Sequence, residues 1–367
     1  MDLTRCAIAA LLLVAVPMSP VVADAAPAAS AGIRAFCVDF NWWGPGGFAP
    51  PGTFARADPE QHLAWYRALG ANVIQTFCVS CDGYAWFRGR VAPVQPGMRG
   101  DFLRELADLG HQHGMKVMGY FCVGANRYWG EQHPELSHGA PSAIHIPLTK
   151  EYLQYLCDTI RDALRRTEID GFMIDWVFNP EPEGEWLECE RRMYVELFGK
   201  PFPGAAGVDA EEKVEFGRRA VDRAWQRIRR AAKSAKPDCV IWLSSHDLAN
   251  PQQKNSRLVR EVDWLMTEGP SRELLDVARA AVGPHAQVIQ CVCGWGAQHP
   301  AGKLLADYAC LGIGFYGFAM PWPETTLPPT FEQADAASGG DAGIAERLRG
   351  NARNIEEMRQ AWTGAIH

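Results

Sequence analysis

Two predicted strands end at a carboxylate, and these two side chains are the strongest candidates for chemistry in the chain. The apolar run Ile169–Trp176 contains Asp175 at its end, and the run Asp263–Thr267 is followed by Glu268. An unpaired buried carboxylate is unfavourable by several kcal/mol or shifts its pKa, so it is tolerated where a strand end opens into a polar cleft. We therefore expect Asp175 and Glu268 to be catalytic.

Other polar and aromatic residues follow the remaining predicted strands, and they are mainly acids, amides and indoles. We expect them to bind substrate: Asp39, Asn41, Trp42, Trp43, Tyr120, Trp176, His246, Asp247 and Trp295. Cleavage of a glycosidic bond requires such a set. One carboxyl group protonates the leaving oxygen while a carboxylate attacks or stabilises an oxocarbenium-like centre, and polar groups and aromatic rings hold the sugar. The pattern predicts a glycoside hydrolase with a carbohydrate substrate.

Structural roles are alternatives for several of these residues. Asp39 would then cross-link strands inside a barrel mouth, and His246 with Asp247 would form a pair that supports Asp175. Glu268 would instead complement the dipole of the helix that follows it, and Asp247 is the reserve acid in that case. Most of the tryptophans would pack against neighbours, with one or two stacking on a sugar ring.

Strand-like and helix-like segments alternate along the chain, which is typical of parallel β/α units. The expected strands are Ile33–Asp39, Asn72–Phe77, Lys116–Cys122, Asp170–Asp175, Cys239–Ser244, Val262–Thr267, Gln287–Cys291 and Gly314–Ala319. The expected helices are Pro59–Leu69, Gly100–His113, Lys150–Arg166, Ala210–Ser234, Gln252–Glu261, Ser271–Val282, Ala301–Leu311 and Ala342–Trp362. Helix ends repeat one device, a glycine suited to the left-handed conformation, at Gly70, Gly114, Gly283 and Gly312.

This order predicts an α/β fold, a (β/α)8 TIM barrel in which residues 31–367 form one domain. The predicted strand-to-helix loops are long, especially 40–58, 79–99, 123–149 and 176–209, whereas the return links are short. Long loops therefore gather at the C-terminal ends of the strands, where active sites of such barrels lie. The candidate residues fall on this face.

Two other barrel chemistries fit less well. Metal-dependent amidohydrolases need His-x-His on the first strand, where this chain has Cys37-Val-Asp39, and His111-Gln-His113 falls at a helix end on the opposite face. Schiff-base chemistry needs a lysine at a strand end, whereas Lys116 begins its strand. No second pair of zinc ligands is found, so we expect no metal and no cofactor.

Composition and the first residues limit the partners and the compartment. The net charge is -7, and the densest basic cluster, Arg227–Arg230, lies on a predicted amphipathic helix, so nucleic acid is excluded as a partner. Residues 1–25 combine Arg5, an apolar run and an A-x-A pattern, which predicts a signal peptide and a secreted or periplasmic protein. No later segment is apolar enough to span a membrane. The oligomeric state stays open.

Ten of the eleven cysteines follow Cys6. Several of them fall in or at the ends of predicted strands, as buried thiols do: Cys37, Cys78, Cys122, Cys291 and Cys293. Export to an oxidising compartment permits disulfides, and Cys78 and Cys81 are close enough in sequence to bridge.

Several motifs resemble the barrel domain of alpha-L-fucosidase-like proteins and related hypothetical glycosyl hydrolases: Phe36–Trp43, Gly114–Phe121, His133–Glu135, Asp170–Trp176 and Thr267–Gly269. The resemblance implies a retaining glycosidase whose nucleophile is the aspartate ending the fourth strand, here Asp175. Related barrels place the acid on the fifth or sixth strand, where Glu268 is the matching carboxylate.

The resulting hypothesis is an exported retaining glycoside hydrolase with Asp175 as nucleophile and Glu268, or Asp247, as general acid/base. The alternative is a non-catalytic carbohydrate-binding barrel. Such a barrel would keep the tryptophan platforms but hold Asp175 or Glu268 in a salt bridge with arginine.

Overall fold

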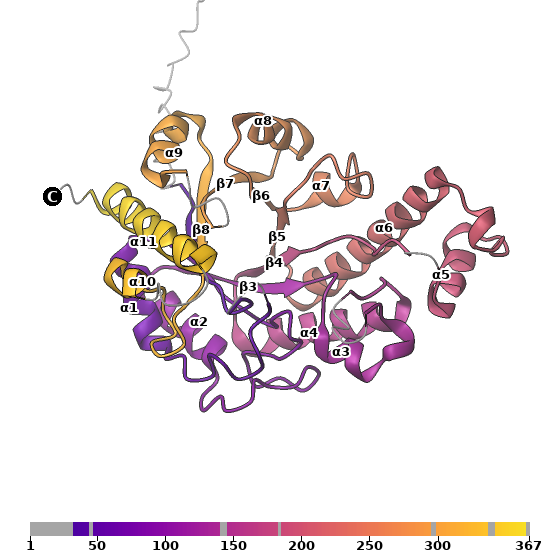
Figure 1. Cartoon of the computed structure of the whole chain (residues 1–367), viewed down its shortest axis with the longest axis horizontal. Coiled ribbons are helices and arrows are strands. Elements are labelled where there is room, and N and C mark those ends of the chain that lie inside the picture. Colours follow the sequence, from indigo (N-terminus) through magenta and orange to yellow (C-terminus); the bar gives the residue numbers. More distant parts are fainter. Residues whose placement is uncertain are drawn as a thin grey trace, which may run out of the picture. The chain divides into compact units, whose positions relative to one another are not determined.

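The eight predicted strands pair in parallel and close into a barrel in the order β1 to β8 (Figure 1). The computed structural model describes residues 32–43, 47–139, 145–182, 185–294, 299–336 and 342–364. The barrel closes where β1 pairs with β8, with Arg34 opposite Phe315 and Val38 opposite Ala319. The predicted (β/α)8 TIM barrel is confirmed.

The strands are β1 Arg34–Val38, β2 Val73–Gln75, β3 Lys116–Cys122, β4 Gly171–Asp175, β5 Val240–Ser245, β6 Trp264–Thr267, β7 Gln287–Cys293 and β8 Gly314–Ala319. The α-helices are α1 Pro59–Leu69, α2 Phe102–Gln112, α3 Arg127–Gln132, α4 Lys150–Thr167, α5 Glu188–Phe198, α6 Ala210–Ala235, α7 Arg257–Glu261, α8 Arg272–Ala281, α9 Ala301–Tyr308, α10 Phe331–Ala336 and α11 Ala342–Thr363. Short 3-10 helices span Pro134–Leu136, Ala205–Gly207 and Ala309–Leu311.

The main differences from the predicted elements lie in the loops. The helix predicted over Gln252–Glu261 begins only at Arg257, because the Asn250 side chain accepts from the Gln252 N–H in a turn and Ser256 caps the helix. Helices α3, α5 and α10 fall in segments that were expected to be loops. Of these, α3 and α10 have six residues each, too few to show a clear apolar period in the sequence.

Three of the four glycines predicted to end helices in the left-handed conformation do so. Gly70, Gly114 and Gly312 have φ values of 80°, 69° and 65°. Gly283 was predicted to act in the same way, but α8 instead ends at Val282 with an extended backbone. At the end of α4, Glu168 takes the left-handed conformation with φ 56°.

Polar side chains reach into the barrel between distant strands. The Tyr316 hydroxyl on β8 donates to Gln75 Oε1 on β2 at 2.9 Å. On the neighbouring strands β6 and β7, Thr267 Oγ1 donates to Gln290 Oε1 at 3.1 Å. All four side chains are buried. These bonds satisfy polar groups that would otherwise destabilise the core, so the barrel accommodates a polar layer beneath the strand ends.

All ten cysteines in the described part of the chain are free thiols, and nine of them are buried. The bridge permitted between Cys78 and Cys81 is not formed. Cys78 Sγ lies against Gly119, where a Cβ would be 2.2 Å away, whereas Cys81 Sγ lies 3.8 Å from the Tyr120 hydroxyl. The two sulfurs therefore have different surroundings.

The predicted signal peptide, residues 1–25, lies outside the described residues. Among the helices that are described, none has both the length and the apolar character needed to cross a bilayer.

Gly171 begins β4, the strand that ends at Asp175, and it has no room for a side chain. A Cβ there would lie 2.0 Å from the Val240 carbonyl oxygen on β5. We expect Gly171→Ala to lower the free energy of unfolding by about 3 kcal/mol, because overpacking forces neighbouring strands apart. Urea unfolding tests this, with Gly47→Ala as the control since a Cβ at Gly47 meets nothing within 4 Å. Equal stability of the two variants would contradict the prediction.

Candidate active site

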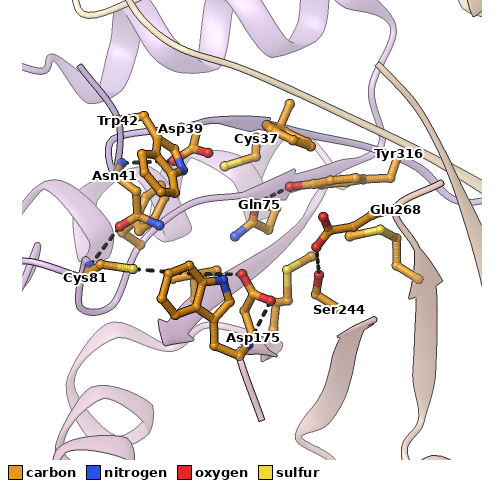
Figure 2. Close-up of a pocket in the computed structure, with 16 residues that line it drawn as sticks. Cys37, Asp39, Asn41, Trp42, Gln75, Cys81, Asp175, Ser244, Glu268 and Tyr316 are labelled. Atoms are coloured by element: carbon orange, nitrogen blue, oxygen red, sulfur yellow. Dashed lines mark hydrogen bonds between the residues drawn. The ribbon is translucent and has the colours of Figure 1, made fainter. Parts of the chain in front are cut away.

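A pocket opens at the C-terminal ends of the barrel strands, on the face predicted from loop lengths (Figure 2). It encloses about 510 Å³ of empty space, part of it open to solvent. The lining residues are Cys37, Asp39, Asn41, Trp42, Gln75, Phe77, Cys81, Tyr120, Met173, Asp175, Trp176, Ser244, Met266, Glu268, Tyr316 and Phe318.

Asp175 is held at the end of β4 by two hydrogen bonds. The Tyr120 hydroxyl on β3 donates to Oδ2 at 2.9 Å, and the Trp176 backbone N–H donates to Oδ1 at 2.8 Å. Trp176 has φ 50°, a left-handed conformation that is uncommon for a residue other than glycine. This turn at the strand end places the Trp176 N–H on the carboxylate and fixes its orientation in the pocket.

The surroundings of Asp175 favour its protonated form. Burial has the largest effect and the negative charge of Glu268 the second, and together they raise the pKa of Asp175 to about 7. The hydrogen bonds from Trp176 and Tyr120 act in the opposite direction but do not offset the other effects. Asp175 is therefore partly protonated at neutral pH.

The raised pKa of Asp175 predicts a pH-dependent cost in stability. The unfolded carboxyl ionises near its model value of 3.8 and the folded one near 7, so the contribution to stability is full below about pH 4 and is lost as the pH rises through 7. We expect Asp175→Asn to match wild type at pH 4 and to exceed it by about 1–3 kcal/mol at pH 8. The full pKa shift would correspond to about 1.4 kcal/mol per pKa unit. We expect a smaller difference in the free energy of unfolding, because water enters the pocket and screens the charges.

Chemical unfolding at several pH values measures this difference. Asp238→Asn, on an exposed turn before β5, is the control and should show no such trend. A constant difference between Asp175→Asn and wild type from pH 4 to pH 8 would exclude a raised pKa at Asp175.

Glu268 follows β6 and is oriented by groups from β5 and the loop after it. Ser244 Oγ donates to Oε1 at 2.7 Å, and His246 Nδ1 lies 3.5 Å from Oε2. The Glu268 side chain is 17% exposed. The N-cap of the following helix, α8, is Ser271 and not Glu268.

A third carboxylate, Asp39, enters the pocket directly after β1. Its Oδ1 accepts from the Asn41 backbone N–H at 2.9 Å, and the residue is 8% exposed. Burial, with a smaller contribution from the charge of Glu268, raises the pKa of Asp39 to about 7, although the Asn41 N–H lowers it. The Asn41 side chain in turn accepts from the Cys81 N–H at 2.8 Å and ties the loops after β1 and β2 together.

Seven of the predicted site residues line this one pocket: Asp39, Asn41, Trp42, Tyr120, Asp175, Trp176 and Glu268. His246 is 86% exposed and reaches Glu268 from outside the lining. Trp43 packs instead against Phe54 and Trp322. Asp247 is exposed, does not line the pocket, and accepts from the Ala249 N–H at 2.7 Å. Trp295 lies outside the described residues.

The sequence reasoning missed the pocket floor, although a signal for it exists. Several floor residues precede a predicted or observed site residue by two positions, as Cys37 precedes Asp39, Met173 precedes Asp175 and Met266 precedes Glu268. Side chains two residues apart on a strand share a face. The residue two positions before each predicted site residue could therefore have been predicted to point into the barrel. The missed lining residues are Cys37, Gln75, Phe77, Cys81, Met173, Ser244, Met266, Tyr316 and Phe318.

Positive charge is scarce around the carboxylates. No arginine or lysine lines the pocket, and in the described ranges none forms an ion pair with Asp175, Glu268 or Asp39. The arginine salt bridge expected of a non-catalytic barrel is thus missing from this part of the structure. Among the same residues, no group of three or more His, Cys, Asp or Glu could hold a metal ion.

Comparison with protein families supports the predicted class, a glycoside hydrolase. Residues 58–176 match the model of the family described as hypothetical glycosyl hydrolase 6. This segment runs from the start of α1 to the residue after β4, so it includes Asp175. The predicted resemblance to hypothetical glycosyl hydrolases is confirmed over this segment. No curated protein sequence matches the chain.

Solved structures with a similar fold include an alpha-L-fucosidase, a glycoside hydrolase domain and AmyP. An alpha-L-fucosidase isoenzyme 2 from Paenibacillus thiaminolyticus gives a TM-score of 0.57 at 15% identity, over 89% of this chain and 49% of the fucosidase. The PgaB (BpsB) glycoside hydrolase domain from Bordetella bronchiseptica gives 0.54 at 13% identity, over 88% of this chain and 98% of that domain. AmyP in complex with maltotriose gives 0.51 at 13% identity, over 90% and 78%. The chain thus spans about half the length of the fucosidase.

Proposed function

We propose that this protein is an exported glycoside hydrolase that cleaves an O-glycosyl bond by a retaining mechanism. Asp175 is the nucleophile and Glu268 the general acid/base. The observation that carries this proposal is the pair of carboxylates from β4 and β6 facing one pocket (Figure 2), each oriented by a hydroxyl group and neither paired with a described arginine or lysine. The match to a glycosyl hydrolase family supports it.

In this mechanism Glu268 gives its proton to the leaving oxygen as an Asp175 oxygen bonds to the anomeric carbon and the glycosidic C–O bond breaks. Glu268 then takes a proton from water, which attacks the same carbon and releases Asp175. Tyr120 and the Trp176 N–H hold the nucleophile, and Ser244 holds the acid. The proposed retention corresponds to carboxyl groups about 5 to 5.5 Å apart.

The aromatic rings at the mouth support binding of a sugar ring. Trp42 and Trp176 line the pocket, and Phe48 lies between them, with ring centroids 4.6 Å from Trp42 and 5.9 Å from Trp176. Indole faces of this kind stack on the apolar face of a sugar, while Asp39 is placed to bind its polar substituents.

Hydrolysis of aryl glycosides tests the proposal directly. The panel comprises fucosides, galactosides, glucosides, xylosides and arabinosides in both anomers, and NMR of the first-formed sugar reports its configuration. We expect turnover of at least one glycone with retained configuration. A product of inverted configuration would make Asp175 a general base. The absence of turnover on every glycoside would exclude the proposed hydrolase activity.

The pH profile tests the protonation states that the mechanism requires. Attack requires ionised Asp175, whose pKa is about 7, and proton donation requires protonated Glu268, so kcat/KM should be bell-shaped and fall about tenfold per pH unit on the acid side of its maximum. A rate that stays constant on the acid side would exclude ionised Asp175 as the nucleophile. Initial rates at low substrate concentration, in buffers of constant ionic strength, give the profile.

We also propose that residues 1–25 direct export and are then removed. Expression of the full chain in a bacterial host, followed by N-terminal sequencing of the extracytoplasmic protein, should show a start near Ala26. An uncleaved cytoplasmic product would contradict export.

A further inference from the structure

The proposed reaction uses two carboxylates, yet the pocket contains three. Asp39 is more than nine-tenths buried and lines the pocket from the end of β1 (Figure 2). Its Oδ1 is used by the Asn41 N–H, and no described protein group donates a hydrogen bond to Oδ2. Neither the attack nor the proton transfer needs this group, so its burial in the pocket requires another explanation.

The charge balance of the pocket indicates what Asp39 binds. Asp39, Asp175 and Glu268 all line the pocket, whereas none of the described residues that line it is a lysine or an arginine. The described basic side chain that contacts one of these acids is His246, which lies 3.5 Å from Glu268 and is 86% exposed. Buried acids without a cation are unfavourable, and a ligand that carries a positive charge relieves the repulsion between them.

We propose that the natural glycone is a 2-amino-2-deoxy sugar with a free amine, and that its ammonium group pairs with Asp39. This inference rests on the proposed function and names its substrate class. The C2 substituent is attached to the carbon next to the one that Asp175 attacks. Asp39 and Asp175 line the same pocket, so a sugar bound there can present its C1 carbon to Asp175 and its C2 substituent to Asp39.

The chemistry of the reaction supports the same pairing. An ammonium at C2 withdraws electrons from the oxocarbenium-like centre and slows cleavage. A carboxylate beside it reduces this effect and also offsets the desolvation of the ammonium. An N-acetylated sugar provides no charge for Asp39, and a neutral hydroxyl gains only a single ordinary hydrogen bond.

The test compares aryl glucosaminides and galactosaminides with the matching 2-hydroxy and 2-acetamido glycosides, all with one leaving group. We expect kcat/KM on the amine to exceed that on either partner by at least about 30-fold, as a buried charge pair adds roughly 2 kcal/mol or more. Asp39→Asn should reduce this ratio to about 1. Asp82→Asn, which neutralises a buried aspartate outside the pocket lining, should keep the ratio.

Two results would overturn the inference while leaving the hydrolase intact. One is faster turnover of the neutral sugars, and the other is an amine preference that Asp39→Asn does not change. If wild type turned over none of the glycosides, the proposed hydrolase function itself would be excluded. Calorimetric binding of methyl glucosaminide and methyl glucoside to wild type then decides amine recognition separately: at least tenfold tighter binding of the amine supports it, and equal affinity excludes it. The same measurement applies if Asp39→Asn does not fold.

Discussion

Replacing Asp175 by alanine should lower kcat on the best aryl glycoside by roughly 10⁴-fold and leave the fold intact. A retaining enzyme cannot form its covalent intermediate without the nucleophile, and losses of several orders of magnitude are typical when such a group is removed. The methyl side chain leaves space next to the anomeric carbon. Azide should enter this space and restore part of the rate, giving a glycosyl azide with inverted configuration.

Two controls make this result specific to Asp175. Asp238→Ala, on the exposed turn before β5, should retain wild-type activity and show no response to azide. The melting temperature of Asp175→Ala should not fall below that of wild type at pH 8, because the substitution removes a carboxyl whose pKa is raised. Activity within tenfold of wild type would exclude Asp175 as the nucleophile.

The second large effect is expected at Glu268 and should depend on the leaving group. Glu268→Ala removes the proton donor, so glycosides with poor leaving groups such as methanol should lose roughly 10³-fold or more in kcat/KM. A dinitrophenyl glycoside, whose leaving group needs no proton, should lose less than about tenfold in its first step. Pre-steady-state measurement of dinitrophenol release separates this step from the slower hydrolysis of the intermediate.

Asp247→Ala is the matched control for the acid, because Asp247 was the reserve candidate. Its carboxylate is exposed, lies outside the pocket lining and is used by the Ala249 N–H. The variant should therefore show equal, small changes on both kinds of glycoside. If the dependence on leaving group appeared in Asp247→Ala rather than in Glu268→Ala, the general acid would have to be reassigned.

The sequence was sufficient to predict two strand ends that line the pocket. An apolar run that stops at a carboxylate marks both a buried strand and its opening to solvent, which is why Asp175 and Glu268 were found together. The observed β3 and β8 match their predicted ends, Lys116–Cys122 and Gly314–Ala319. The apolar run and the carboxylate that ends it are neighbours in the chain, so a single sequence is enough to recognise them.

The hydrogen bonds that orient the carboxylates could not be predicted, because their donors come from other strands. Tyr120 was expected to bind substrate and not to donate to Asp175. Tyr120 is 55 residues from Asp175, and Ser244 is 24 residues from Glu268. Their contacts depend on the stagger of neighbouring strands, which the hydrophobic pattern does not give. Trp43 was predicted to bind substrate, but its indole packs against Trp322 away from the pocket. It lies beyond the strand end, where side chains no longer alternate between two faces.

The free thiols have a consequence for how this protein reaches its native state. Burial raises the pKa of most of them, that of Cys157 to about 11 for example, so in the folded protein they are shielded from thiol–disulfide exchange. The unfolded chain has no such protection, and its thiols would cross-link in an oxidising compartment. Under the proposed export, barrel closure therefore competes with oxidation of the thiols during folding. The native state is durable once formed, while yield depends on how quickly it forms.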